Sequence, residues 1–371
     1  MSYDCAIALL NRVRRVEHDL TPERTIAAIV EREGNAVHAQ IEQWASGILK
    51  AHDFSEDGQP RTVEACDDGQ GMCIPAARVE ATRAAYNATR SEEYHIPPEA
   101  AAQRYEDPEQ AVNVSLDDVG VKRQKETRKQ GASGKACGAE PEPSGVPEAS
   151  PRYVHNTITH IQSALGTYVL NGCGTVSVLR LVIAFLLHGG LLFGRPIQFF
   201  VDGQRTLQAA ILERLKWLPG KRMILDWFHL RKRCEQDLST ALRGRFVRNA
   251  ALSRLLPLLW LGRVDAAIDY LRNLGADSFK ADRSPDVLIG YLERNREHIP
   301  CYALRKQLGL RNSSNCGEKA NDLCVAARQK HQGMSWSTSG SVVLASIVTL
   351  RHNRELARWC AEHQIGFQMV A

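Results

Sequence analysis

The chain has 371 residues, of which 44% are hydrophobic and 24% charged, and its formal net charge is +5. This composition is typical of an ordinary soluble globular protein, and the length predicts two or three structural units. The charge is uneven: residues 1–110 carry 11 Lys and Arg against 20 Asp and Glu, and the remainder carries 36 against 22. The basic part is therefore the expected nucleic-acid face.

The cysteines and apolar segments exclude a secreted or membrane-bound class. Ten cysteines follow no pairing pattern and no secretory leader precedes them, so we expect reduced thiols in the cytoplasm. The longest apolar run, 176–193, is interrupted by Arg180 and His188 and is too short to span a bilayer. No membrane role is expected.

Residues 1–110 are predicted to form a helical N-terminal region. Thr21-Pro22 is a helix-start signal, and an apolar face at helical spacing follows it up to Trp44. Residues 51–75 are rich in Asp and Gly and indicate a loop, and residues 76–90 indicate a second helix.

Residues 111–234 alternate between strand and helix patterns. Val112, Val114 and Leu116 alternate with polar residues and predict a strand that ends on Asp117-Asp118. A Gly, Pro, Ser and Ala-rich linker at 130–150 is expected to be disordered. After the linker we expect a strand at 152–170 and an apolar helix at 175–190. They are followed by a strand PIQFFVDG that ends at Asp202-Gly203, an amphipathic helix QRTLQAAILERLKWL and a strand KRMILDWFH. This alternation predicts an α/β unit with parallel strands.

The rest of the chain is predicted to be helical. Residues 235–310 form one helical stretch, and residues 311–371 supply the last helices. The segment SSNCGEKANDLCVAARQKHQGMSWS begins with helix-starting residues and places Glu318 on the first turn, before a basic stretch and Trp336. Two strand-end aspartates followed by a helical glutamate have the order that a two-metal nuclease site requires.

Four motifs of this chain are VNVSLDD, FFVDG, MILDWFHLRKRC and SNCGEKAND…RQKHQGMSWS. Together they resemble bacterial insertion-sequence transposases of the DDE class, in the branch related to Mutator-like elements. The resemblance covers roughly residues 110–355. It implies an RNase H-like mixed sheet flanked by helices, with an all-helical insertion at 235–310 before the last catalytic helix. Residues 1–110 would then recognise the DNA ends, although they show no helix-turn-helix or zinc signature.

The resemblance also implies a mechanism. Asp117, Asp202 and Glu318 would be the catalytic residues and would hold two Mg²⁺ ions, for which Mn²⁺ can substitute. The expected activity is Mg²⁺-dependent DNA strand cleavage and strand transfer. The expected partners are the element ends and target DNA, bound by a homo-oligomer at the nucleoid. Two alternatives are a transposase-derived DNA-binding protein that has lost catalysis, and an RNase H-like nuclease.

Each acid has an alternative interpretation. Asp117 could cap its strand while Asp118 binds the metal, and Asp202 could belong to an Asp-Gly turn. Glu318 could close a capping box with Asn315, in which case Asp322, one turn further on, is the reserve ligand.

Auxiliary and DNA-binding roles are also predicted. His229 follows a strand at a position where the family has a histidine near the metals, although a core histidine is the alternative. Phosphate contacts are expected from cations in two stretches, whose alternative is a solvated helix face. They are Arg231, Lys232, Arg233, Arg328 and Lys330. Trp336 could stack on a base, but a core indole is the preferred interpretation.

Overall fold

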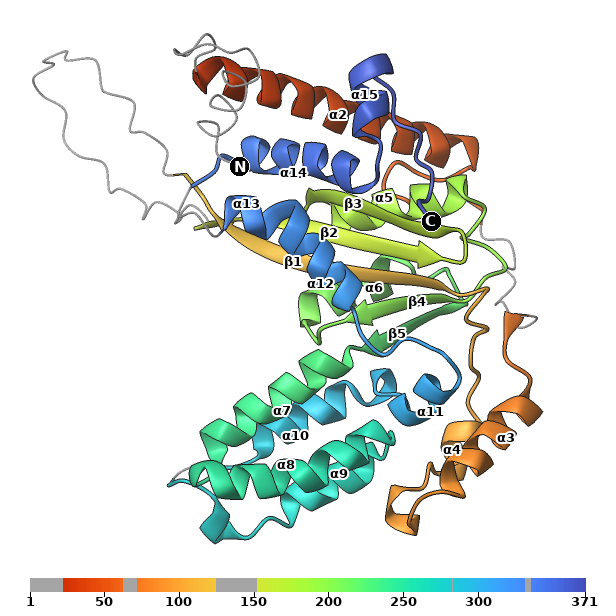
Figure 1. Cartoon of the computed structure of the whole chain (residues 1–371), viewed down its shortest axis with the longest axis vertical. Helices are drawn as coiled ribbons and strands as arrows, with labels where there is room; N and C mark the ends of the chain where they lie inside the picture. Colours follow the sequence, from red (N-terminus) through yellow and green to blue (C-terminus); the bar gives the residue numbers. More distant parts are fainter. Residues whose placement is uncertain (1–22, 63–71, 125–151, 282, 331–334) are drawn as a thin grey trace, which may run out of the picture.

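A computed structural model describes residues 23–62, 72–124, 152–281, 283–330 and 335–371. The expected linker at 130–150 and the helix start at Thr21-Pro22 lie outside these residues. The fold is mixed α/β, with one five-stranded sheet of order β3-β2-β1-β4-β5 and helices on both of its faces (Figure 1). The α/β class expected from the alternating strand and helix patterns is thus confirmed.

The sheet combines an antiparallel half with a parallel half. Strand β1 pairs antiparallel with β2 and parallel with β4, β2 pairs antiparallel with β3, and β4 pairs parallel with β5. The strands are β1 (Val112–Lys122), β2 (Tyr153–Ser163), β3 (Gly166–Cys173), β4 (Ile197–Val201) and β5 (Lys221–Leu225). Strands β1, β4 and β5 run in the same direction; β4 and β5 end side by side at one edge of the sheet, and β1 continues past them to Lys122.

Three strand predictions were wrong in detail. The first strand does not end on Asp117-Asp118 but continues to Lys122, because Val119 and Val121 pack in an apolar cluster on the other side of the sheet. Residues 152–170 form not one strand but the hairpin β2–β3, whose turn ends at Gly166 with a φ of +128°. Strand β5 ends at Leu225 rather than His229, because Asp226 caps the following helix and accepts a hydrogen bond from the His229 N–H at 2.9 Å.

Alternate residues of β1 face the two helical layers. Val112, Val114 and Leu116 join the main core, which includes most of α5. Val119 and Val121 pack on the opposite face, against the helices that follow residue 314. Asp117 shares the side of Val119 because side chains alternate along a strand. The covering helices and turns are α5 (Thr175–His188), α6 (Arg205–Arg214), α12 (Asn315–Asn321), a π-helical turn (Asp322–Ala326), α13 (Ala327–Gln329) and α14 (Thr338–His352).

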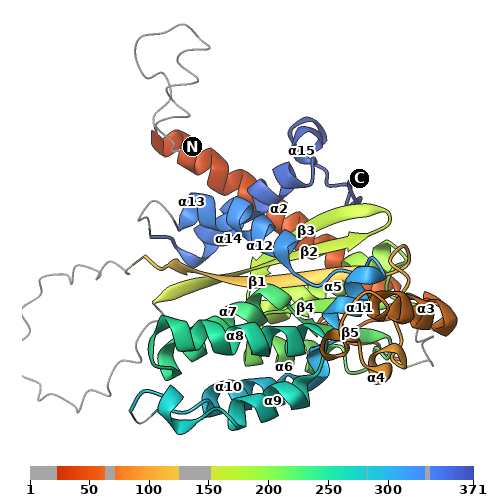
Figure 2. The same ribbon diagram turned by 60° about the horizontal axis from the view of Figure 1, so that its bottom comes forward.

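Five helices lie between β5 and α12, below the sheet in Figure 1. Figure 2 shows the first four of them stacked side by side beneath the strands. They are α7 (Trp227–Ala241), α8 (Gly244–Trp260), α9 (Val264–Arg272), α10 (Asp286–Arg294) and α11 (Tyr302–Gln307). The helical prediction for 235–310 is therefore confirmed in type, with α7 beginning eight residues earlier, at Trp227.

The N-terminal region contributes to two separate parts of the core. Helix α2 (Glu23–Ala51) packs against α5 and α14, where Arg180 of α5 forms an ion pair with Glu42 at 2.5 Å. Helices α3 (Ala76–Asn87) and α4 (Pro98–Ala101) instead pack in a second apolar cluster together with α11. The final helix is α15 (Leu356–Glu362). Within the described part of the chain, no helix is long and apolar enough to cross a membrane.

Candidate active site

Asp117 lies on β1, facing α12, and its carboxylate is partly buried. Its Oδ2 accepts a 2.5 Å hydrogen bond from the Nδ2 of Asn321, the last residue of α12. Sequence reasoning did not identify Asn321. Because Asn321 follows Glu318 by three residues, the two side chains share one helix face, and this spacing is the only sequence signal that could have indicated a role for Asn321.

Asp202 directly follows β4, the strand beside β1. Its Oδ1 accepts a hydrogen bond from the Gln204 N–H at 2.8 Å, which fixes the carboxylate above the start of α6. Gly203 has a φ of +88°, and a Cβ at this position would come within 2.4 Å of the Tyr291 hydroxyl. Glycine is therefore required here by backbone conformation and by the close approach of α10. A helix follows the Asp-Gly pair, so a hairpin turn is excluded.

Asp226 connects the two helix starts that carry the remaining site residues. It is completely buried, and it caps α7. Its Oδ2 accepts hydrogen bonds from both the N–H and the hydroxyl of Ser314, the residue before α12; the bond to the hydroxyl measures 2.9 Å. One carboxylate thus holds the first turns of α7 and α12 together, although they are far apart in the sequence.

Glu318 and His229 face each other from these two helices. The Nε2 of His229 lies 2.6 Å from Oε1 of Glu318, and a carboxylate can only accept, so Nε2 carries the proton. The capping-box interpretation of Glu318 was wrong, because Ser314 rather than Asn315 precedes the helix and Glu318 bonds to His229. The core-histidine alternative was also wrong, because the His229 side chain is 30% exposed.

The other two predicted acids, Asp202 and Glu318, act on Asp117 electrostatically. Burial raises the pKa of the Asp117 carboxyl above its ordinary value, and the nearby charges of Asp202 and Glu318 raise it further. The hydrogen bond from Asn321 and the charge of His229 act in the opposite direction. The structure therefore brings Asp117, Asp202 and Glu318 into one region with His229 at its edge, and this region has an excess of negative charge.

The two reserve acids do not share this arrangement. Asp118 accepts hydrogen bonds from the Thr157 hydroxyl and, at 3.3 Å, from the Thr175 hydroxyl at the start of α5, so it faces the opposite side of the sheet from Asp117. This geometry contradicts the alternative in which Asp118 replaces Asp117 as the metal ligand. Asp322 begins the π-helical turn and is exposed.

The predicted DNA-binding cations lie on α7, on α13 and directly after α13. Arg231 pairs with Glu235 at 2.8 Å and Arg233 with Asp237 at 2.7 Å, each one turn further along α7, while Lys232 is exposed. Arg233 also lies over the ring of Tyr291 at 5.2 Å. Two of the three α7 cations are thus already partnered by acids of their own helix, which weakens their attraction for phosphate.

The second cationic stretch lies after the π-helical turn. Arg328 is half-buried on α13, and Lys330 directly after it is exposed. Trp336 donates from its indole nitrogen to the Gln329 carbonyl at 3.2 Å and packs against the apolar cluster of Val119. The core interpretation of Trp336 is therefore confirmed.

Among the described residues, a metal site is not preformed. Within the residues that the structure describes, no three or more His, Cys, Asp or Glu side chains are arranged to hold one metal ion. Comparisons with protein-family models, with curated proteins and with solved structures gave no match to this chain. Its function must therefore be inferred from the geometry of the site.

Proposed function

We propose that this protein is a DDE-class DNA transposase that cleaves and joins DNA strands with Mg²⁺. The observation that carries this proposal is that three acids from separate elements lie near one another: Asp117 within β1, Asp202 directly after the neighbouring β4, and Glu318 on the covering helix α12, with the charges of Asp202 and Glu318 acting on Asp117. Acids separated by 85 and 116 residues in the sequence need no such proximity for stability, since their mutual repulsion opposes folding.

The topology supports the finer fold assignment. An RNase H-like sheet has three antiparallel strands followed by two parallel ones in the order 3-2-1-4-5, which is the order observed here. The helices between β5 and α12 occupy the place of the helical insertion of such transposases. The α10 residue Tyr291 contacts the loop that carries Asp202, so this insertion also shapes the candidate site.

The donor set fits Mg²⁺ in chemistry and in charge. Magnesium takes oxygen ligands and is commonly held by one or two carboxylates together with waters and substrate phosphates, so a preformed three-acid cage is not required. Asp117, Asp202 and Glu318 would provide these carboxylates, and Glu318 would exchange its bond to His229 for the ion. When bound, two such ions activate the attacking hydroxyl and stabilise the leaving oxygen.

The protein's own residues position these groups. Asn321 orients the Asp117 carboxylate, the Gln204 N–H orients Asp202, and Asp226 fixes α12 relative to α7. His229 holds the Glu318 side chain at the edge of the site. Once Glu318 moves away, the Nε2–H of His229 can donate to a phosphate oxygen.

Replacement of Glu318 by Gln tests the proposal. The glutamine keeps the size of the side chain and an acceptor oxygen for His229, but it removes the negative charge that a divalent cation needs. We expect nicking of DNA in Mg²⁺, measured with the sequences that flank the coding region, to fall by at least about a hundredfold. DNA binding, measured by gel shift at fixed ionic strength, should persist or strengthen.

Glu362→Gln serves as the matched control, because Glu362 is exposed at the end of α15 and the substitution removes the same charge. It should nick DNA like the parent. Equal nicking by Glu318→Gln and the parent would remove Glu318 from the site and refute the proposal.

One observation favours a second candidate function, a transposase-derived DNA-binding protein without catalysis. In the described residues no three potential ligands are arranged around one ion, which is also what a decayed site would show. The same assay separates the two functions, because the second candidate predicts salt-sensitive DNA binding without nicking by the parent protein.

A further inference from the structure

The turn between α7 and α8 carries the large apolar side chain with the greatest exposed fraction among the described residues. This side chain is Phe246, in the first turn of α8, and it is 86% exposed. Helix α7 leads away from β5 to this turn (Figure 1). A single exposed apolar residue is ordinary on a protein surface. The surroundings of Phe246 are not, because Arg243 and Arg245 are close to it in the sequence and both are exposed.

Backbone hydrogen bonds fix this turn against the segment that precedes α10. The Arg243 N–H donates to the Ser278 carbonyl at 2.9 Å. The Lys280 N–H donates to the Ala241 carbonyl, also at 2.9 Å. Leu242, which lies between the two bonded residues of the turn, is buried in the main core. The turn is therefore a fixed support, and the chain before α10 brings Lys280 next to it.

The side chains at this turn carry an excess of positive charge. Described residues 239–249, 276–281 and 283 contain five cations and one acid, Asp277. Arg248 donates to the Ser239 hydroxyl at 3.1 Å, and the Lys280 ammonium donates to the Ser239 carbonyl at 2.7 Å. Both acceptors are neutral, so the charges remain. Within the described part of the chain, none of the five cations forms an ion pair. Together with Phe246 they form a surface that we call the corner surface: Arg243, Arg245, Arg248, Lys280 and Arg283.

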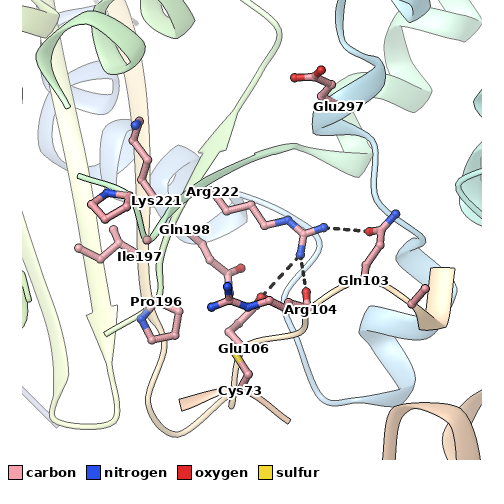
Figure 3. A pocket seen from close by; sticks show the side chains of 13 residues that line it. Cys73, Gln103, Arg104, Glu106, Pro196, Ile197, Gln198, Lys221, Arg222 and Glu297 are labelled. Carbon is pink, nitrogen blue, oxygen red and sulfur yellow. Dashed lines mark hydrogen bonds and ion pairs between the residues drawn. The ribbon is translucent and has the colours of Figure 1, made fainter. Parts of the chain in front are cut away.

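Two other groups of arginines are engaged by acids or by neighbouring side chains. On α7, Arg231 and Arg233 each pair with an acid one turn further along the helix. In the cavity beside the beginnings of β4 and β5, Arg222 lies 3.9 Å from Glu106 and donates to the Gln103 side chain at 3.1 Å (Figure 3). The corner surface differs from both groups, because its cations have no paired acid among the described residues and can attract a polyanion from solution.

We propose that the corner surface binds single-stranded nucleic acid, with an unpaired base stacked on the Phe246 ring. Lysine and arginine neutralise backbone phosphates, and aromatic side chains stack on bases of any sequence. A nucleic-acid strand combines a row of negative charges with flat apolar faces, and this combination complements exposed cations around an exposed ring. In a duplex the base faces are covered by their neighbours, so only the phosphates would reach this surface. The corner surface lies outside the acid cluster, and the proposal does not depend on catalysis.

The test is fluorescence anisotropy of the full chain with three labelled probes: a short single-stranded DNA, the RNA strand of the same sequence and the blunt DNA duplex. We expect saturable binding of at least one single strand, and the tighter one identifies the natural class. Phe246→Ala should weaken single-strand binding at least about fivefold, because base stacking is lost, and should leave duplex binding within about twofold of the parent. Phe246→Trp should bind like the parent, whereas Phe246→Leu should not, since leucine is apolar but has no flat face.

Single replacements of the arginines test the charges. Each lost phosphate contact lowers the slope of log Kd against log salt by about 0.7 for a single strand, so Arg243→Gln and Arg245→Gln should each reduce the slope by about that amount. Arg24→Gln is the charge-matched control, because Arg24 is exposed on the first turn of α2. Leu165→Ala is the control for loss of an exposed apolar side chain, because Leu165 is 60% exposed between β2 and β3. Both controls should bind like the parent.

Thermal unfolding should show that every variant is folded, since the replaced side chains are exposed. Absence of saturable single-strand binding by the parent, parent-like binding by Phe246→Ala, or equal losses of single-strand and duplex binding would overturn the proposal. Analytical ultracentrifugation adds a further test. If the parent self-associated and Phe246→Ala abolished self-association without weakening nucleic-acid binding, the corner surface would be an interface between copies of the chain, which also overturns the proposal. DNA nicking by the parent together with any of these results would refute the corner surface alone and leave the proposed function intact.

Discussion

Replacement of the buried Asp226 by Asn should destabilise the protein strongly while changing only a few atoms. Asparagine caps helices about as well as aspartate, so its carbonyl can still accept from the His229 N–H. Its amide group, however, would face the N–H and hydroxyl of Ser314, which now donate to Oδ2. Two hydrogen bonds to a buried charge would be lost, each contributing roughly 1.5–3 kcal/mol.

We therefore expect Asp226→Asn to lower the free energy of unfolding by about 3–6 kcal/mol, a large part of the total for a typical protein. The measurement is urea denaturation at pH 7.5 with the slopes compared, because a change in slope would indicate an altered unfolded state. Because α12 is held through Ser314, the proposed function also predicts that DNA nicking falls in conditions where the variant is still folded.

Asp265→Asn is the control for this experiment. Asp265 lies on the first turn of α9, its side chain is 75% exposed, and it pairs with Arg296 at 2.6 Å. A surface pair of this kind contributes about 1 kcal/mol or less. If Asp226→Asn lost no more stability than Asp265→Asn, Asp226 would not be the connection between α7 and α12 that the structure indicates.

Two further predictions concern α12 and its contact with β1. Folding raises the pKa of the Asp117 carboxyl. The carboxyl therefore stabilises the folded protein fully only below its pKa in the unfolded chain, and this stabilisation is lost as the pH rises through its pKa in the folded protein. Asp117→Asn should therefore raise the unfolding temperature at pH 7.5, and this increase should shrink as the pH is lowered. Mg²⁺ should raise the unfolding temperature of the parent but not of this variant, and an equal rise in both would contradict a role of Asp117 in ion binding. Gly317→Ala would place a Cβ 2.7 Å from the Ser115 Cβ, so it should lower the free energy of unfolding, measured by urea denaturation, by about 1–3 kcal/mol. The additional change Ser115→Gly should restore most of that loss. If Gly317→Ala left the stability unchanged, α12 would not pack closely on β1.

The sequence allowed the fold class to be predicted because its strands are short apolar runs bounded by turn residues. The predictions around β4 and α5 succeeded, since nearly every residue there is apolar and buried. The β2–β3 hairpin was missed because its turn at Ala164 and Leu165 lacks the Asn-Gly or Asp-Gly pair that usually marks a tight turn. A tertiary contact between Gly166 and the chain end at Val370 accompanies this turn, and a local pattern cannot reveal it.

The acids of the candidate site were predicted from their positions, but their supporting residues were not. Asp202 directly follows a strand, where a local pattern can place it, whereas Asp117 lies in the middle of β1 and was placed by the alternation of the residues before it. Asn321 and Ser314 act through bonds to residues 204 and 88 positions away. Such pairings depend on the packing of α12 against β1 and α7, and neither propensity nor hydrophobic period carries that information.

The hydrogen bond between Asn321 and Asp117 also has a consequence for the order of events during synthesis. The two residues are separated by 204 positions, so at roughly 5–20 residues per second the ribosome needs about 10–40 s to add Asn321 after Asp117. During that interval neither Glu318 nor Asn321 exists. A nascent chain can therefore contain all five strands of the sheet before it has the three acids, and the candidate site assembles only after Glu318 and Asn321 have been synthesised.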